Sequence, residues 1–331
     1  MGAVALELHL SHRGTRRWLG GAFLLFGVCI LGFSTPGGTQ QSWGLPAKSI
    51  ANNEPITPLP MPSSADPARV ALGERLFADP RLSHDNSRSC TTCHDVNDNG
   101  ATRNVRDLAL DGTPLHLNTL TVFNAAASFR LSWTGNSRTF EDQARRSIES
   151  PRIMGSTVAE AAAKLDADPE MRRSFELAYG KPPDEAALLD AISVYERSLL
   201  TPGSRFDRWL QGDTVALTGS ELRGYQLFKS LGCVSCHQGV NIGGNLLERH
   251  GIFHPLASPE PAILRVPNLR NVATTAPYFH DGSATTLEEA VERMGYAQLN
   301  TLLQPDEVTD IVAFLKTLTG NINGHPVGQP Q

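Results

Sequence analysis

The chain has 331 residues and a formal net charge of −5, with 29 basic and 34 acidic side chains. That length suffices for two ordinary domains, and the mild, interspersed charge gives no support to nucleic-acid binding. Aromatic residues make up only 7%, whereas there are 29 glycines and 22 prolines. This composition suits helices joined by long loops around cofactors.

The first 35 residues have the layout of an export signal. Arg13, Arg16 and Arg17 precede an apolar run over residues 19–33, which is a basic region followed by a hydrophobic one. A helix that spans a bilayer needs about 20 apolar residues, so this run is short for a permanent anchor. No small-x-small cleavage site stands out, which leaves an uncleaved inner-membrane anchor open. We therefore predict an exported, periplasmic protein with a signal peptide or anchor over 1–35.

A Pro-, Ser- and Gly-rich linker is predicted over 36–65. The first helix is predicted to begin at Asp66-Pro67, because Asp is a preferred N-cap and Pro is favoured at the first helical position. Asp79-Pro80 should end it. Apolar residues at helical spacing predict further helices over 140–149, 158–165 and 185–200.

The second half of the chain is predicted to start after Thr201-Pro202-Gly203, which breaks the preceding helix. Thr218 and Glu221 form a capping box, and so do Thr286 and Glu289. The last helix should cover 306–319 and stop at Gly320. No strand pattern is convincing, so the predicted fold class is mainly α.

Two pentapeptides, Cys90-Thr-Thr-Cys93-His94 and Cys233-Val-Ser-Cys236-His237, use four of the five cysteines. Each is typical of a c-type haem attachment site. The two thiols add to the haem vinyl groups, and the histidine gives its imidazole to the iron from the proximal side.

Two other interpretations fit less well. A four-cysteine zinc site requires both pairs to converge, usually from nearby segments, and would leave both histidines without a role. A thioredoxin-like pair requires a neighbouring βαβ pattern, which is absent from the sequence. Each half instead repeats one plan, a helix followed by a haem-attachment segment. We predict two cytochrome c-like domains, each with one covalent haem, over 66–204 and 205–322, followed by a tail over 323–331.

The sequence resembles the bacterial di-haem cytochrome c peroxidases over roughly residues 67–320. The resemblance is carried by LGERLF (72–77), TVFNA (121–125), YER (195–197), and VPNLRNV (266–272) with APYFHDG (276–282). A related group, the di-haem enzymes that mature methylamine dehydrogenase, shares the fold but places a tyrosine where this chain has Met294.

The resemblance implies a role for individual positions. His94 and His237 become the proximal ligands, and Met294 is selected from Met61, Met154, Met171 and Met294 as the distal ligand of an electron-accepting C-terminal haem. By the same resemblance, Trp133 lies between the haems, His280 lies close to the C-terminal haem, and Gln143 belongs to the distal pocket of the N-terminal haem. A calcium ion, which prefers oxygen ligands, is implied at Asn118, Thr275 and the carbonyl of Pro277.

Two positions depart from the family pattern. Leu110 stands where the family has a distal histidine, and Ile153 stands where it has the glutamate that moves a proton during peroxide cleavage. His116 and Glu149 are the nearby substitutes if the loops differ, and Glu149 is the candidate acid–base residue on this view. The alternative is that both are ordinary surface residues.

Two functions follow from the resemblance. The first is a peroxidase that takes electrons from a small soluble donor, a cytochrome c or cupredoxin, through the C-terminal haem to the N-terminal haem, where hydrogen peroxide is reduced to water. The second is a di-haem electron carrier or redox sensor that has lost the catalysis. We favour the peroxidase, since nearly all other motif positions are retained. The resemblance also implies a homodimer.

Overall fold

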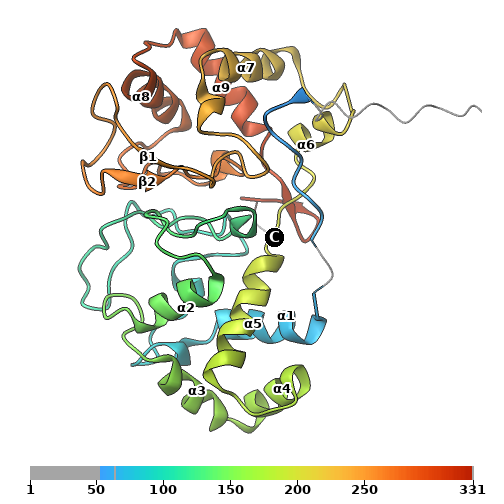
Figure 1. Cartoon of the computed structure of the whole chain (residues 1–331), viewed down its shortest axis with the longest axis vertical. Coiled ribbons are helices and arrows are strands. Elements are labelled where there is room, and N and C mark those ends of the chain that lie inside the picture. Colours follow the sequence, from blue (N-terminus) through green and yellow to red (C-terminus); the bar gives the residue numbers. More distant parts are fainter. Residues whose placement is uncertain (1–52, 63–64, 330–331) are drawn as a thin grey trace, which may run out of the picture. The chain divides into compact units, whose positions relative to one another are not determined.

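Two groups of helices make up the computed structural model, which describes residues 53–62 and 65–329 (Figure 1). The N-terminal group consists of α1 (Pro67–Phe77), α2 (Phe140–Glu149), α3 (Val158–Asp166), α4 (Pro169–Tyr179) and α5 (Glu185–Ser198). The C-terminal group consists of α6 (Arg205–Leu210), α7 (Gly219–Ser230), α8 (Leu287–Leu299) and α9 (Pro305–Lys316). The predicted mainly α class is confirmed.

The expected export signal lies outside the described residues. Within the ranges that are described, none of the helices combines the length and the apolar character that crossing a membrane would require.

The helix ends follow the predicted signals at most positions. Asp66 caps α1, and its carboxylate accepts the N–H of Ala68 at 2.9 Å. Helix α2 has the predicted bounds.

Helix α4 was not predicted, although it begins with the same Asp-Pro signal as α1. The carboxylate of Asp168 accepts the N–H of Glu170 at 2.9 Å. Helix α6 was also missed, because six residues are too few to show a period.

One of the two predicted capping boxes forms completely. Thr218 Oγ1 accepts the N–H of Glu221, and the Glu221 carboxylate accepts the N–H of Thr218 at 2.7 Å. The box at Thr286 is only half correct. Thr286 accepts the N–H of Glu289 at 3.1 Å, but the Glu289 carboxylate accepts the N–H of Thr285 instead, at 2.8 Å.

Short strands occur where none were predicted. β1 (Leu247–Arg249) pairs antiparallel with β2 (Ile263–Arg265), with Glu248 opposite Leu264. β3 (Asn321–Ile322) pairs antiparallel with β4 (His325–Pro326). Strands of two or three residues cannot display the alternation by which a strand is recognised in a sequence.

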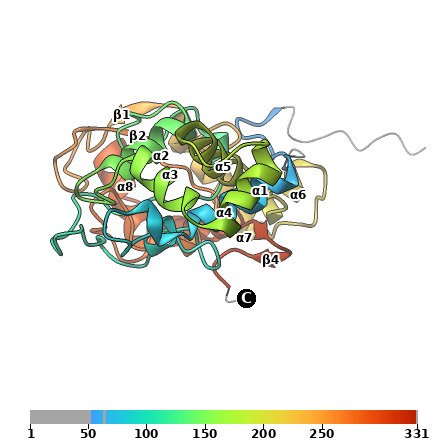
Figure 2. The same cartoon turned by 90° about the horizontal axis from the view of Figure 1, so that it is seen from below.

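The two groups share one helix-crossing geometry. Gly73 lets α1 approach α5, because a Cβ atom there would overlap the carbonyl oxygen of Ala191. Gly224 does the same for α7 and α9 at the carbonyl oxygen of Asp310. Helices α1, α4 and α5 lie side by side in both views (Figures 1 and 2). The predicted repeat of one plan is therefore present in the structure.

Aromatic pairs extend this correspondence. The rings of Phe77 and Tyr195 lie 5.4 Å apart at the first crossing, and those of Phe228 and Phe314 lie 5.2 Å apart at the second. Gly73, Phe77 and Tyr195 thus correspond to Gly224, Phe228 and Phe314.

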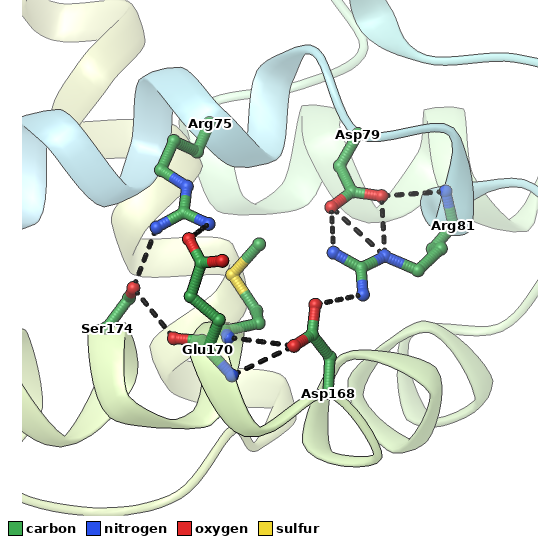
Figure 3. Close-up of polar contacts among 7 residues, drawn as sticks. Arg75, Asp79, Arg81, Asp168, Glu170 and Ser174 are labelled. Carbon is green, nitrogen blue, oxygen red and sulfur yellow. Dashed lines mark hydrogen bonds and ion pairs between the residues drawn. The ribbon is translucent and has the colours of Figure 1, made fainter.

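Two arginines attach α4 to α1 and to the turn that follows α1 (Figure 3). Arg75 on α1 pairs with Glu170 at 2.8 Å. Arg81 bridges Asp79 at 2.6 Å and Asp168 at 2.9 Å. The carboxylate of Asp168 therefore serves both as the N-cap of α4 and as a partner of Arg81. Asp79 and, to a smaller extent, Asp168 raise the pKa of Arg81, and Arg81 lowers that of Asp168.

The described part of the expected linker packs on the C-terminal group. Ile56 is fully buried in the same apolar cluster as Phe206 and Tyr225. The hydroxyl of Tyr225 donates to Glu54 at 2.6 Å, and Arg270 donates to the carbonyl of Thr57 at 3.0 Å. This segment is thus part of the fold, although its composition indicates only a linker.

The C-terminal tail returns to the N-terminal group. Val327 is buried in a cluster with Phe77, Phe123 and Tyr195. The N–H of Gly328 donates to the carbonyl of Asp98 at 2.9 Å, in the loop that follows the first haem-attachment segment. The last residues of the chain therefore complete the core of its first half.

Candidate functional site

The two Cys-x-x-Cys-His segments fold in the same way. Cys90 and Cys233 each open a single 3₁₀ turn, η3 (Cys90–Thr92) and η5 (Cys233–Ser235). The N–H of His94 donates to the carbonyl of Cys90 at 2.9 Å, and that of His237 to the carbonyl of Cys233 at 3.0 Å. The four cysteines are unpaired and partly buried. Each segment thus presents two thiols and one imidazole from one tight turn.

The histidine rings are held by matching hydrogen bonds. Nδ1 of His94 lies 3.2 Å from the carbonyl oxygen of Gly100, and Nδ1 of His237 lies 3.3 Å from that of Ile242. A carbonyl only accepts, so Nδ1 carries the proton and Nε2 keeps its lone pair for a metal. Burial lowers the pKa of both imidazoles, that of His237 to about 4, which favours the neutral form that a ligand requires.

An aromatic side chain lies beside each of these rings. The ring centroids of Phe77 and His94 are 6.4 Å apart at 47°, and those of Phe228 and His237 are 6.3 Å apart at 50°. The helix before each attachment segment therefore helps to orient the proximal imidazole.

A cavity of about 240 Å³ lies against the second segment. Cys233, Cys236 and His237 line it together with Met294 of α8 and Leu315 of α9. The structure thus brings the predicted attachment residues and the predicted distal methionine to the wall of one largely apolar cavity, as a haem requires.

Trp133 contributes to that cavity although it comes from the first half of the chain. Its indole N–H donates to the carbonyl of Asn118 at 2.7 Å. Its ring lies 6.2 Å from that of His280, edge to face. His280 is buried, and its Nε2 lies 3.0 Å from the carbonyl oxygen of Ser258. Trp133 and His280 therefore lie together, beside the C-terminal attachment segment.

Arg265 is a site residue that the sequence did not reveal. Its side chain is 5% exposed and lines the cavity, and Nε donates to the carbonyl of Ser132 at 2.9 Å. Among the described residues Nη1 has no hydrogen-bond partner, and burial lowers the pKa of the guanidinium to about 10. A buried cation needs an anionic partner, and the propionate groups of a haem fit that need. The position could not be recognised from the sequence, because it lies just outside the VPNLRNV stretch.

The three expected calcium ligands also line this cavity: Asn118, Thr275 and Pro277. The side-chain amide of Asn118 donates to the carbonyls of Asn104 and Val105, both at 3.1 Å. These bonds use the nitrogen of the amide and leave its oxygen, Oδ1, for a cation. The donor set is therefore made of oxygens, as Ca²⁺ prefers.

The two departures from the family pattern lie close together. The N–H of Leu110 donates to the carbonyl of Arg152 at 3.0 Å. A Cβ atom on Gly155 would lie 3.0 Å from Leu110 Cδ1. Ile153 is half-buried between these two contact points. Two aliphatic side chains thus stand at the positions where the resemblance predicts a histidine and a glutamate.

The residues considered as substitutes lie at the surface. His116 is exposed. Glu149 is exposed at the end of α2, and its carboxylate pairs with Arg145 at 3.1 Å. Gln143, on the same helix, is half-buried and donates to Ser147 at 3.2 Å. The structure therefore does not bring His116 or Glu149 into the interior beside Ile153.

Comparison with known proteins agrees with these observations. A family model described as di-haem cytochrome c peroxidase matches residues 67–215, and one described as cytochrome c matches residues 222–319. A cytochrome c551 peroxidase of Nitrosomonas europaea is 40% identical over 82% of this chain and 86% of its own length. A cytochrome c551 peroxidase of Pseudomonas aeruginosa is 35% identical over 90% and 92%.

Solved structures show the same likeness. A MauG-like protein associated with microbial copper homeostasis superposes with a TM-score of 0.68 and 27% identity, covering 84% of this chain and 95% of that one. The diheme peroxidase BthA of Burkholderia thailandensis superposes with a TM-score of 0.65 over 78% and 87%, at 22% identity, which shows a common fold.

Proposed function

This chain belongs to the di-haem cytochrome c peroxidase family, and on that premise we propose that it reduces hydrogen peroxide to water at an N-terminal haem, with electrons that enter through a C-terminal haem. One structural observation, the position of Trp133, supports the proposal independently of the family relationship. Trp133 comes from the first half of the chain but lies in the wall of the C-terminal cavity, edge to face with His280. An aromatic side chain shared between the two halves suits electron transfer between two haem centres.

The residues of both sites fit a covalent haem c. Cys90 and Cys93 would hold one haem and Cys233 and Cys236 the other, with His94 and His237 as proximal ligands through Nε2. When bound, each haem supplies an iron that changes oxidation state. The protein contributes neutral, oriented imidazoles, an apolar cavity, and the guanidinium of Arg265 for a propionate.

Met294 is proposed as the sixth ligand at the C-terminal site. Its position on α8, in the wall of the cavity that His237 also lines, supports this role. A thioether favours ferrous over ferric iron, so that this centre would have the higher potential and store an electron.

The N-terminal site is proposed to stay open. Leu110 cannot bind iron, so peroxide would enter without the prior release of a histidine. Ile153 cannot move a proton, so the side chains available near the distal side are the amide of Gln143 and, if the loop rearranges, the carboxylate of Glu149. The same pair of aliphatic residues favours the second candidate, an electron carrier or redox sensor with little peroxidase activity.

A calcium ion is proposed at Asn118, Thr275 and Pro277. The oxygen donors and their common position in the cavity wall support it. In this place the ion would join a loop of the first half of the chain to a loop of the second.

The proposed setting is the periplasm. The basic and apolar pattern of residues 1–35 supports export, with or without an inner-membrane anchor. A small soluble cytochrome c or cupredoxin is proposed as the electron donor, since relatives are named cytochrome c551 peroxidases. A homodimer is proposed from family kinship alone.

Stopped-flow mixing of the reduced, two-haem protein with peroxide tests the function. A peroxidase oxidises both haems at a rate that rises with peroxide concentration, and it turns over when a reduced cytochrome c is supplied. The Cys90→Ala/Cys93→Ala protein, which retains the C-terminal haem, is the control. Oxidation no faster than in this control would leave the carrier or sensor as the function.

A further inference from the structure

Glu196 is a buried acid for which the proposed reaction assigns no role. It lies on α5, is 7% exposed, and its Oε2 has no hydrogen-bond partner among the described residues. Burial raises the pKa of this carboxyl to about 8. Burying an unpaired carboxylate is energetically unfavourable, so this environment favours the protonated acid.

By the internal repeat of the fold, Glu196 corresponds to a residue in the wall of the C-terminal haem site. Tyr195 of α5 corresponds to Phe314 of α9, because each packs on the glycine and phenylalanine of the crossing helix. The next residue is Glu196 in the first half and Leu315 in the second. Leu315 lines the C-terminal cavity. The acid therefore occupies the position from which an aliphatic side chain faces the other haem site.

A second observation agrees with this placement. Cys90 packs against the apolar cluster that contains Tyr195, the residue before Glu196, and the pKa of its thiol is raised first by burial and then by the charge of Glu196. Cys90 is the residue that would carry one edge of the N-terminal haem. The carboxylate of Glu196 is thus close enough to interact electrostatically with this attachment point.

The other charged groups around Glu196 are few. From its own helix Arg197 lowers its pKa, and from α2 the partly exposed Glu141 raises it. On α1, Glu74 acts on Tyr195. The η4 turn (Ala125–Ala127) carries no ionisable side chain. The charged groups of α3 have partners elsewhere: Glu160 with His84 and Lys164, and Asp166 with Arg172.

We propose that Glu196 is a redox-linked proton site of the N-terminal haem. With a haem bound there, the carboxylate of Glu196 would take up one proton from solvent when the haem gains one electron, and the acid would release the proton when the haem loses the electron. Electron and proton enter together, so the net charge of the site does not change. The inference rests on the proposed function only for the source of the electron, which is the C-terminal haem.

The coupling follows from electrostatics. Reduction removes one positive charge from the iron, so the nearby carboxylate is less stabilised and its affinity for a proton rises. By linkage, deprotonation of Glu196 must favour the oxidised haem by the same free energy. In a chain that has Ile153 where the family has an acid–base glutamate, Glu196 would keep an exchangeable proton in the haem wall.

Redox titration of the two-haem protein without peroxide tests the proposal, with each haem followed by its own absorption between about pH 6 and pH 10. In the wild type the potential of the N-terminal haem falls as pH rises through this range. In Glu196→Gln that fall is lost, apart from any slope due to the haem propionates, and the C-terminal potential is unchanged. Proton uptake on reduction, measured with a pH indicator, decreases in parallel.

Two further variants keep the test decisive. Glu196→Leu copies the residue at the corresponding position of the C-terminal group and serves if the Gln variant does not load its haems. Glu141→Gln removes the neighbouring acid and should retain the slope. A wild-type slope that persists in both Glu196 variants overturns the proposal. Absence of peroxide turnover with the slope intact would count against the proposed function and not against Glu196.

Discussion

Asn124 and Asn271, one from each half of the chain, donate their side-chain amides to the same atom, Oγ1 of Thr201, at 2.8 and 3.0 Å. Both asparagines are fully buried, and both have positive φ angles, 60° and 63°. The backbone N–H of Asn124 donates to the carbonyl of Leu199, and that of Asn271 to the carbonyl of Leu318. Thr201 thus joins two equivalent turns at the point where the halves meet.

Thr201→Val should lower the free energy of unfolding, because it leaves two buried amide groups without an acceptor. The expected loss is about 1–3 kcal/mol, measured by urea unfolding followed by circular dichroism. Thr201→Ser, which keeps the hydroxyl, is the matched control and should lie close to the wild type. Equal stability of the Val variant and the wild type would contradict the structure at this contact.

The chain should carry two covalent haems, since both attachment segments have the same folded geometry. The pyridine haemochrome assay should return two haems per chain after acid extraction. The Cys90→Ala/Cys93→Ala variant should return one. A value of one for the wild type would show that one segment is not used.

Met294→His should lower the potential of the C-terminal haem, because imidazole stabilises ferric iron better than a thioether does. The thioether-to-iron charge-transfer band in the red should disappear in the same variant. Met171, which is buried in the core of the N-terminal group, offers a control substitution, Met171→Leu. If Met294→His left both haem potentials at their wild-type values, the ligand assignment would be wrong.

Ile153→Glu should accelerate peroxide cleavage by part of the roughly 10²–10⁴-fold that general acid–base catalysis supplies. The reason is that a carboxyl at this position could carry a proton between the two peroxide oxygens. Stopped-flow absorption measures the rate, with Ile153→Gln as the control of similar shape.

Leu110→His should slow peroxide cleavage by the oxidised protein, because an imidazole at this position would occupy the iron until reduction releases it. Electron paramagnetic resonance of the oxidised protein should show a high-spin N-terminal haem in the wild type and a low-spin one in this variant.

A wild-type rate of peroxide cleavage that is already fast and falls in Glu149→Gln would show that the Glu149 carboxylate reaches the N-terminal haem site.

The stability of the protein with its N-terminal haem reduced should depend on pH through Glu196. Burial raises the pKa of Glu196 from its ordinary 4.5 to about 8 in the folded state, so between these values the folded state holds a proton that the unfolded chain has released. The free energy of unfolding therefore falls as pH rises through this window and levels off above it. Urea unfolding at about pH 5 and pH 9 gives the free energy of unfolding of the wild type and of Glu196→Gln. Between these two pH values the variant should lose less stability than the wild type. A difference that does not change with pH would contradict the burial of this acid.

Local signals predicted much of the fold. Asp66 before Pro67 and Thr218 before Glu221 gave correct helix starts, because capping depends on neighbouring residues alone. The two attachment segments were equally local. The start of α4 carries the same local signal, Asp168 before Pro169, so the sequence contains the information for this helix as well.

Other features could not be predicted because they depend on distant residues. Nothing near Val327 indicates that it packs on Phe77, and nothing near Ile56 indicates burial beside Phe206. Arg265 and Glu196 are ordinary charged residues in the sequence. Their importance appears only when folding removes their neighbouring water and leaves Nη1 and Oε2 without partners.

The return of the tail has a consequence for how the molecule matures. A chain emerges from the ribosome, or through a membrane, from its first residue to its last. Since Val327 closes the cluster around Phe77, the N-terminal core stays incomplete until residue 327 has appeared, on the order of 10–50 s after His94 at about 5–20 residues per second. During that interval the first pair of thiols belongs to an unfinished structure.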